Sequence, residues 1–396
     1  MPIQRNSIYM NVKKFVFVVQ GEGRGHLTQA IATYEMLVAQ GHIVSAVIIG
    51  SNKCKEVPAF VKTRIKAPVV TISSPHFIKD KHNRAISVTR SLLYALRNLR
   101  KYYQSLRFIK DVIRNHRPDI IVNFYEPLVG IASALYTLPV KVISVAHQYL
   151  YLHPDFSFPR ESNKRDQWLI KFYTRLTAFR SESLLALSFY PMQRMQYDRI
   201  KVCAPLLRKE IAQQEIYKGK YILVYLVNAG YMKNIIDWHK QHPETEIHCF
   251  TDSSAVKGKW DYSESLHFHS LDDRKFLYYM ANAAGLATTA GFESVCEAMY
   301  MGKPVMMVPV ENHFEQWCNA RDAASCGAGI YADYFNLALL KEYLPQHPDQ
   351  TEIMRSWVAQ AESIIKQSIR GLFEDPASSL PSPLDSVESF EGQAIG

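Results

Sequence analysis

A glycine-rich turn after the first apolar segment constrains the fold of this chain more than any other feature. Residues 15–19 are all apolar, as in a strand that is buried on both faces of a parallel sheet. The turn Gly-Glu-Gly-Arg-Gly-His follows at 21–26, then a helical stretch at 27–39 and a second apolar strand at 42–50. This order predicts a right-handed β-α-β unit, in which the glycines let the backbone turn sharply and bring its amides toward a ligand.

The residues of this turn favour some ligands over others. The pattern is GxGxGH rather than GxGxxG, and the second strand ends in Gly50, Ser51 and Asn52, with no acidic residue to bind a ribose. Both features argue against a nicotinamide dinucleotide. His26, at the mouth of the turn, has a side chain that can accept a hydroxyl proton near neutral pH. The alternative that His26 only caps the helix stays open.

A second series of strands and helices begins at residue 220. Its first strand, 221–227, is apolar and leads into Asn228, Ala229 and Gly230. Two such series predict an α/β fold with two Rossmann-like doubly wound domains that face each other across a cleft. Further strands are expected at 68–72, 119–123, 140–146, 246–250 and 305–309, and helices within 85–116 and at 231–241, 273–283 and 293–301.

The expected domain boundaries follow from these two series. The parts are an N-terminal domain at 12–205, a C-terminal domain at 219–350, a helix at 351–372 that packs back toward the N-terminal domain, and a tail at 377–396. The tail is rich in Ser, Pro and Gly, which predicts disorder.

Composition bounds the cellular setting. No apolar run reaches the roughly 18–20 residues that span a bilayer, and the N-terminus lacks the apolar stretch of a secretory signal. The six cysteines are scattered without a close pair, which argues against a zinc knuckle and against a disulfide framework. We therefore expect a cytoplasmic protein in a reducing compartment.

A second group of residues with chemical potential lies between 288 and 320. Thr289, Ala290 and Gly291 predict a tight turn, and the helix that follows has free amides at its start, where anionic oxygens bind well. Glu297 lies one turn inside this helix, three residues after Ser294. Taken one at a time, such acids are usually just part of a solvated helix face.

Together, the two segments resemble the nucleotide-sugar-binding signature of GT-B glycosyltransferases, with family 1 and the lipid II N-acetylglucosaminyl transferases (family 28) as the nearest parallels. The N-terminal part of the resemblance is QGEGRGHLTQA at 20–30. The C-terminal part is Gly291-Phe292-Glu293-Ser294-x-x-Glu297, then Gly302-Lys303-Pro304, Val308-Pro309 and Glu315-Gln316-x-x-Asn319-Ala320. Because both parts occur in order, the resemblance covers both expected domains.

The resemblance implies roles for donor-side residues. Glu297 corresponds to the acid that holds the donor ribose hydroxyls, a role that suits its paired acceptor oxygens. The other implied donor contacts are Ser294 and the backbone of Gly291 and Phe292 for the diphosphate, Glu315 and Gln316 for sugar hydroxyls, and Asn228 and Gly230 in a second phosphate-facing turn.

On the acceptor side, His26 corresponds to the histidine that acts as general base in many family 1 enzymes, with Gly25 beside it. The Asp that usually orients this histidine has no firm counterpart, and Asn123 and Glu126 are the nearest candidates. The cationic diphosphate ligand of relatives falls on Thr289, so either the dipole and amides of the helix suffice, or Arg24 or Lys233 supplies that charge. The chain has no DxD motif, which agrees with a mechanism that needs no metal and no cofactor besides the donor.

A basic segment spans residues 79–117. It carries eleven Lys or Arg and two Asp, a net charge of +9 that equals the excess of the whole chain. Apolar residues recur in it at helical spacing, at Leu92, Leu93, Leu96, Leu99, Tyr103 and Leu106. This stripe is either the buried face of a helix or a basic amphipathic surface for an anionic membrane. No recognised motif supports binding of nucleic acid.

We therefore predict a glycosyltransferase that moves a sugar from a nucleoside diphosphate donor, expected to be UDP-linked, to an acceptor hydroxyl. A lipid or a cell-envelope glycan is the candidate acceptor, with the enzyme peripheral at the inner membrane face. Two alternatives remain: a nucleotide-sugar epimerase of the same fold, and a non-catalytic protein that binds sugar nucleotides or serves as a membrane-associated scaffold.

Overall fold

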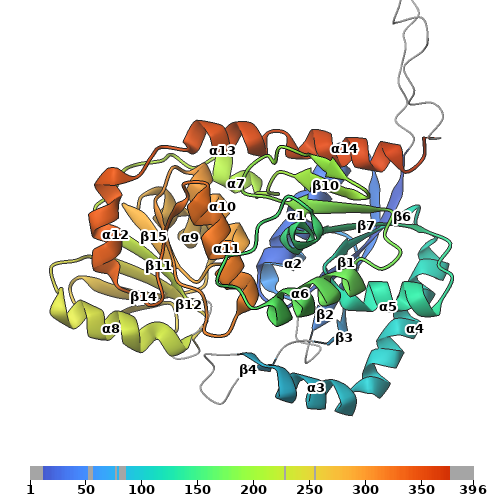
Figure 1. The fold of residues 1–396 in the computed structure, drawn as a ribbon, viewed down its shortest axis with the longest axis horizontal. Helices are drawn as coiled ribbons and strands as arrows, with labels where there is room; N and C mark the ends of the chain where they lie inside the picture. Colours follow the sequence, from blue (N-terminus) through green and yellow to red (C-terminus); the bar gives the residue numbers. More distant parts are fainter. Residues whose placement is uncertain are drawn as a thin grey trace, which may run out of the picture.

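The computed structural model describes residues 12–51, 57–75, 78–79, 86–226, 229–253 and 256–374, with only the backbone at 78–79 and 86–92. Two mainly parallel sheets form the centres of two halves that lie side by side (Figure 1). The first sheet ends with residue 203 and the second begins with residue 222. The connecting segment between them, 204–221, carries the short helix α7 (Lys209–Ala212). We refer to these parts as the N-terminal half, the connecting segment and the C-terminal half.

The first sheet has eight strands in the order β3-β2-β1-β6-β7-β8-β10-β9. Its strands are β1 (Lys14–Gln20), β2 (Ile43–Ser51), β3 (Val69–Ser73), β6 (Ile120–Phe124), β7 (Lys141–Ala146), β8 (Ser183–Leu187), β9 (Gln196–Tyr197) and β10 (Ile200–Cys203). Its helical elements are α1 (Gly25–Ala39), α2 (Ala59–Arg64), α3 (Val88–Arg97), α4 (Leu99–His116), α5 (Pro127–Leu135), η1 (His147–Leu152) and α6 (Lys164–Thr177). A separate antiparallel pair joins β4 (Ile78–Lys79) and β5 (Ile86–Ser87).

The second sheet has seven strands in the order β13-β14-β12-β11-β15-β16-β17. Its strands are β11 (Ile222–Leu226), β12 (Ile247–Thr251), β13 (Lys259–Asp261), β14 (Leu266–Ser270), β15 (Gly285–Thr288), β16 (Val305–Met307) and β17 (Gly329–Tyr331). Its helical elements are η2 (Ala229–Tyr231), α8 (Met232–Gln241), α9 (Asp273–Ala281), α10 (Phe292–Tyr300), α11 (Phe314–Ser325), α12 (Leu337–Tyr343) and η3 (Leu344–Gln346).

The first strand shows why the apolar pattern predicted this fold. Residues 15–19 of β1 are fully buried between the parallel neighbours β2 and β6. Apolar side chains on both faces of a strand remain buried only when helices cover both faces of its sheet. The predicted α/β class with two doubly wound sheets is confirmed.

The last helical region returns to the N-terminal half. A single helix was expected at 351–372, but the structure has α13 (Thr351–Val358) and α14 (Ala361–Gly371), which cross both halves (Figure 1). The interruption lets α13 pack on α10 while α14 reaches β10. The buried indole of Trp357 donates a hydrogen bond to the Ser188 carbonyl (3.0 Å), which fixes this crossing point.

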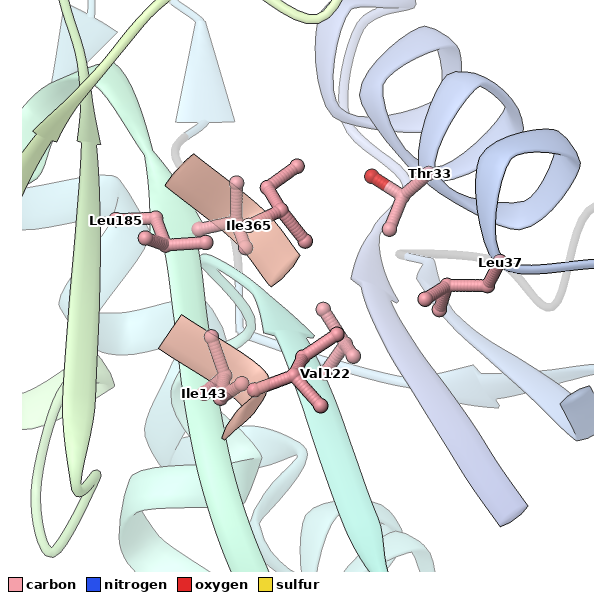
Figure 2. Close-up of a pocket in the computed structure, with 8 residues that line it drawn as sticks. Thr33, Leu37, Val122, Ile143, Leu185 and Ile365 are labelled. Atoms are coloured by element: carbon pink, nitrogen blue, oxygen red, sulfur yellow. The ribbon is translucent and has the colours of Figure 1, made fainter. Parts of the chain in front are cut away.

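A small apolar pocket lies where α14 packs on the first sheet. Figure 2 shows Ile365 of α14 directed toward the strands, with Thr33 and Leu37 of α1 on the opposite side. The remaining lining residues are Val122, Ile143, Val145, Leu185 and Ile369. The purely apolar strand residues and the small opening are typical of a packing joint between a helix and a sheet, since small-molecule sites also carry convergent polar groups.

The apolar residues of the basic segment are partly buried and partly exposed. Leu106 is buried under α4, whereas Leu93, Leu96, Leu99 and Tyr103 are each at least half exposed. Among the described side chains, the stripe is therefore core only in its C-terminal part, while the side chain of Leu92 lies outside the description. Helix α3 lies at the periphery of the N-terminal half (Figure 1). Within the described ranges, no helix is both long and apolar enough to cross a bilayer. The predicted tail at 377–396 lies outside the described residues.

Candidate active site

The glycine turn of the N-terminal half lies tightly against the end of β2. The Gly21 amide donates a hydrogen bond to the Gly50 carbonyl (2.7 Å). A side chain at Gly21 would place its Cβ only 2.6 Å from that same oxygen, so no other residue fits there without displacing the backbone. Gly23 has a φ of +79°, in the left-handed region that favours glycine. These two glycines aim the start of α1 at the edge where the parallel strands end.

His26 is in the first turn of α1 and has a defined tautomer. Its Nδ1 lies 3.2 Å from the Gln29 amide oxygen. Because an amide oxygen only accepts, Nδ1 carries the proton and Nε2 keeps its lone pair. Burial lowers the pKa of His26 to about 4, so the ring is neutral at physiological pH. A neutral imidazole with a free Nε2 lone pair can accept a proton from a hydroxyl group.

Tyr125 holds the other side of the His26 ring. The two rings are stacked with centroids 5.6 Å apart. Tyr125 follows β6 with a φ of +59°, an uncommon conformation for a residue with a side chain. Its hydroxyl shares a hydrogen bond with Thr174 of α6 (2.8 Å). Strained backbone positions of this kind cluster at functional sites, where the surrounding contacts maintain them.

Asn123 and Glu126 form hydrogen bonds with residues other than His26. Asn123 is fully buried and donates to the Thr177 carbonyl (2.9 Å), while its oxygen accepts from the Glu126 amide (2.9 Å). Glu126 caps α5 and accepts from Ser74 (2.5 Å). The expectation that one of them orients His26 is therefore corrected, because Gln29, one helical turn along α1, occupies Nδ1. The spacing i, i+3 on a helix was the sequence signal for this contact.

The turn of the C-terminal half joins β15 to α10. The Gly291 amide donates to the Thr289 carbonyl (2.6 Å), and Gly291 is the residue that precedes α10. The Ser294 hydroxyl donates a hydrogen bond to the Gly291 carbonyl (3.3 Å). Gly230 lies in η2 at the carboxyl end of β11, the strand beside β15, so it shares this sheet edge. Asn228 lies outside the described residues.

The acids of α10 are held by residues from outside the C-terminal half. Glu297 is 2% exposed, and its Oε1 accepts from Arg208 of the connecting segment at 2.7–2.8 Å. Burial raises the pKa of Glu297 above its ordinary value, while Arg208 opposes this shift. A ligand that binds the Glu297 carboxylate must therefore share it with Arg208 or displace Arg208.

Glu293 faces α1 directly. Its Oε1 accepts from the Gln29 amide (2.6 Å), and a Cβ added at Gly25 would lie 3.3 Å from the Glu293 side chain. Burial raises the pKa of Glu293 to about 8, so most of this carboxyl group is protonated at pH 7. Gln29 thus bridges His26 of one turn to Glu293 of the other.

Three comparisons relate this chain to known proteins. The model of the family described as glycosyl transferase family 1 matches residues 13–348. The chain belongs to glycosyl transferase family 1. An uncharacterized glycosyltransferase of Methanosarcina acetivorans is 22% identical over 363 residues, which cover 84% of this chain and 88% of that protein.

Solved structures show that the fold of this transferase is GT-B. The glycotransferase of kitacinnamycin superimposes with a TM-score of 0.61 at 14% identity, covering 91% of this chain and 98% of that one. UGT2 of Phytolacca americana, complexed with UDP-2fluoro-glucose and pterostilbene, gives 0.60 at 10% identity, with coverage of 91% and 99%. MurG of Acinetobacter baumannii gives 0.51 at 16%, with coverage of 91% and 99%.

The second motif of the transferase continues on α11. Glu315 accepts from the Gln148 amide of η1 (2.9 Å), and burial raises its pKa to about 7. Gln316 turns back and accepts from the Val310 amide (2.9 Å). Asn319 accepts from the Tyr151 hydroxyl of η1 (2.9 Å). This start of α11 is therefore also in contact with the N-terminal half.

Sequence reasoning missed His147, which the fold brings to the same interface. It follows β7, is 2% exposed, and stacks on Phe292 at 4.2 Å between ring centroids. Its Nδ1 donates to the Leu187 carbonyl (2.8 Å), since a carbonyl only accepts. Its position at the carboxyl end of a parallel strand, where ligands bind in α/β sheets, was the available signal.

Positive charge at the site comes from two arginines. Arg24, in the glycine turn, forms an ion pair with Asp273 at the start of α9. Arg208 lies 3.4 Å from the same carboxylate while it holds Glu297. Arg24, Asp273, Arg208 and Glu297 thus form a chain of charges between the two turns. Lys233, the other expected cation, is 81% exposed and pairs with Asp237 on its own helix.

Proposed function

We propose that this transferase moves a sugar from a UDP-linked donor to an acceptor hydroxyl, with His26 as the general base. The observation that carries the proposal is the bridge His26–Gln29–Glu293, which joins a neutral imidazole to the start of α10. The bridge joins the proposed base to the helix that, in this proposal, binds the donor. Support for the donor class comes from UGT2, whose structure contains UDP-2fluoro-glucose.

On the donor side, the amides at the start of α10 bind the diphosphate together with Ser294, Gly291 and Phe292. Amides at a helix start offer a favourable partial positive charge to phosphate oxygens. Thr289 supplies no charge, so Arg24 and Arg208 supply it from outside the helix. Glu297 holds the ribose, and Gly230 faces the phosphates from the neighbouring turn.

The sugar lies between the halves in this proposal. Glu315 and Gln316 bind its hydroxyls from the start of α11. The protonated Glu315 carboxyl can donate a hydrogen bond, and the ionised carboxylate can accept one. With a pKa of about 7, both forms exist near neutral pH, so Glu315 can bind a sugar hydroxyl as donor or as acceptor. The acceptor enters beside Gly25, on the side of Asn123 and Glu126.

The chemical step is a displacement at the anomeric carbon. The acceptor oxygen forms the new bond to that carbon, its proton passes to His26 Nε2, and the bond to the diphosphate oxygen breaks. The amides of α10 and the two arginines stabilise the charge that develops on the leaving diphosphate. No step of this proposal uses a metal ion or a further cofactor.

Nucleotide binding tests the donor assignment. UDP and UDP-sugars are expected to raise the Tm of the full chain, whereas NAD is not, because a ligand that binds only the folded state stabilises it. Glu297→Gln is expected to weaken UDP binding about 10- to 100-fold, and the exposed Glu362→Gln is the matched control. Unchanged affinity in Glu297→Gln contradicts the ribose contact. Epimerised free nucleotide sugar, formed without any acceptor, would instead identify an epimerase.

We also propose that α3 and the start of α4 dock on an anionic membrane, which favours a lipid acceptor. Leu96 and Leu99 are 55% and 58% exposed, and Arg97, Arg100 and Lys101 beside them are also exposed. Exposed leucines flanked by cations are typical of helices that lie in a membrane interface.

Co-sedimentation with vesicles tests this surface. The protein is expected to bind anionic vesicles more than neutral ones, and Leu96→Asp with Leu99→Asp is expected to abolish the difference. Leu339→Asp, at an exposed leucine of α12, is the matched control. Equal binding to neutral and anionic vesicles contradicts the proposal.

A further inference from the structure

A cluster of histidines and acids lies on the outer strands of the second sheet, apart from the candidate active site. In the parallel pair β12–β14, His248 is directly opposite His267. Glu246 comes two residues before His248, and His269 two residues after His267. Because side chains alternate along a strand, residues two apart point to the same face. Four groups with metal-binding chemistry are thereby gathered on one face of this edge.

Three of these groups have the spacing of metal ligands. One ligand atom from each of Glu246, His248 and His267 lies within 4.8 Å of the other two. Glu246 Oε1 and His248 Nε2 are 3.2 Å apart. Ligand atoms around a tetrahedral zinc ion are about 3.4 Å apart, given bonds of about 2.1 Å. Glu246 is 49% exposed, so its side chain has the freedom to close the remaining gap.

Further groups support the two histidines from behind. Nδ1 of His267 lies 2.5 Å from the Asp261 carboxylate, and Nδ1 of His248 lies 3.0 Å from Nε2 of His269. A ligand histidine in a metal site usually donates its second N–H to such a partner, which fixes its tautomer and orientation. The nearby cation, Lys259, is paired with Asp261 at 2.7 Å.

We propose that Glu246, His248 and His267 bind one divalent transition-metal ion, with Zn²⁺ as the best match. Two imidazoles and one carboxylate suit zinc, and a water molecule completes four-coordinate geometry. Hard cations such as Mg²⁺ are disfavoured, because they require mainly oxygen ligands. Asp261 and His269 are positioning residues in this site.

The topology separates this metal site from sugar transfer. His248 and His267 are each the second residue of their strands, and Glu246 precedes β12. They therefore lie at the amino ends of parallel strands, whereas the turn at 289–291 follows the carboxyl end of β15. The metal would fasten β14, and through it β13, to β12 at the sheet edge. The proposal does not depend on the proposed function.

Cobalt binding tests the site, because Co²⁺ reports its ligands by visible absorption. Untagged full-length protein is stripped with EDTA and titrated with Co²⁺, then with Zn²⁺. We expect one Co²⁺ per chain, without a thiolate charge-transfer band, and displacement by one Zn²⁺. Asp261→Asn, which keeps all three ligands, is expected to weaken binding about 10- to 100-fold. His242→Ala, a histidine of the same half that stacks on Trp238, is the control and is expected to bind normally.

Two results would overturn the proposal. One is the absence of saturable binding by the unmodified protein, which would assign His248 to packing against the rings of Tyr221 and Tyr279, and His267 to stacking on His248. The other is undiminished binding by a His248→Ala, His267→Ala double variant. Glu246→Gln changes an exposed side chain and leaves the fold intact, so weaker cobalt binding with an unchanged transfer rate in this variant supports a site separate from catalysis.

Discussion

The two strand-to-helix turns of this transferase share a backbone plan but differ in how their side chains are held. In the N-terminal turn, His26 is fixed by Gln29 and Tyr125, both within its own half. In the C-terminal turn, Glu293 and Glu297 are fixed by Gln29 and Arg208, which come from outside that half. The candidate base is therefore preorganised locally, whereas the donor-side acids take their partners from the interface. Contact between the halves thus controls one side of the site more than the other.

The largest expected effect concerns His26, which is held by residues of its own half. His26→Ala is expected to lower kcat/KM about 100- to 10,000-fold through loss of a general base, with UDP affinity unchanged. Initial rates and UDP titrations measure the two quantities. His347→Ala, a histidine of the C-terminal half, is the control.

The pH profile sharpens this prediction. Because burial lowers the pKa of His26 to about 4, the base is unprotonated at neutral pH and loses activity only as the pH falls through about 4. The acid limb of kcat/KM should therefore lie near pH 4 rather than at the ordinary histidine value of about 6.5. Full activity in His26→Ala would remove the base assignment.

The second prediction concerns Glu297, whose partner Arg208 comes from outside the C-terminal half. Arg208→Ala leaves Glu297 buried without its cation, which is expected to lower the free energy of unfolding by about 3–5 kcal/mol. The side chains of Arg208 and Glu297 are only 12% and 3% exposed. Lys366→Ala removes a pair that is 41% and 55% exposed, and is expected to cost less than about 1 kcal/mol. Urea unfolding of both variants measures the difference, and equal small changes would contradict a tightly held Glu297.

The third prediction concerns the residue that joins both sides. Gln29→Ala removes the partner of His26 Nδ1 and of Glu293, and is expected to lower kcat about 10- to 100-fold through misplacement of the base. KM for the acceptor should change little, and the acid limb of the pH profile should move. Gln40→Ala, at the other end of α1, removes only an exposed contact to Glu362 and serves as the control. A loss confined to stability, with kcat intact, would show that Gln29 does not position His26.

The smallest expected effect is that replacing Glu293 by glutamine stabilises the folded chain at high pH. The pKa of Glu293 is raised to about 8 in the folded chain, against about 4.5 when unfolded, so the unfolded chain binds fewer protons between these values. Stability from this group therefore falls as the pH rises from about 4.5 to 8. Glu293→Gln keeps the oxygen that accepts from Gln29 and avoids ionisation.

We expect Glu293→Gln to be more stable than the unmodified chain by about 1–3 kcal/mol at pH 8 and equal to it near pH 4.5. Urea midpoints at the two pH values measure this, with Glu362→Gln as the exposed control. A variant that loses stability equally at both pH values would indicate an ionised, charge-paired Glu293.

Much of the fold could be predicted because it depends on local patterns. The apolar run of β1, its glycine turn and α1 are consecutive, and the spacing of their residues already predicts a β-α-β unit. The short strands β8, β14, β15 and β17 were missed, since runs of three to five residues carry little periodic signal. The interruption between α13 and α14 was also missed, and the contact beside it, from Trp357 to Ser188, joins residues 169 apart in the sequence.

The sequence by itself determined the two doubly wound sheets, the two turns at their carboxyl ends, and the residue types presented there. Only the tertiary structure decided which side chains meet. Gln29 and Glu293 are 264 residues apart, Gln148 and Glu315 are 167 apart, and Arg208 and Glu297 are 89 apart. The histidine cluster likewise depends on the register of β12 against β14. Local spacing sets backbone conformation, but contacts between distant segments depend on how complete sheets and helices pack, and no local pattern encodes that geometry.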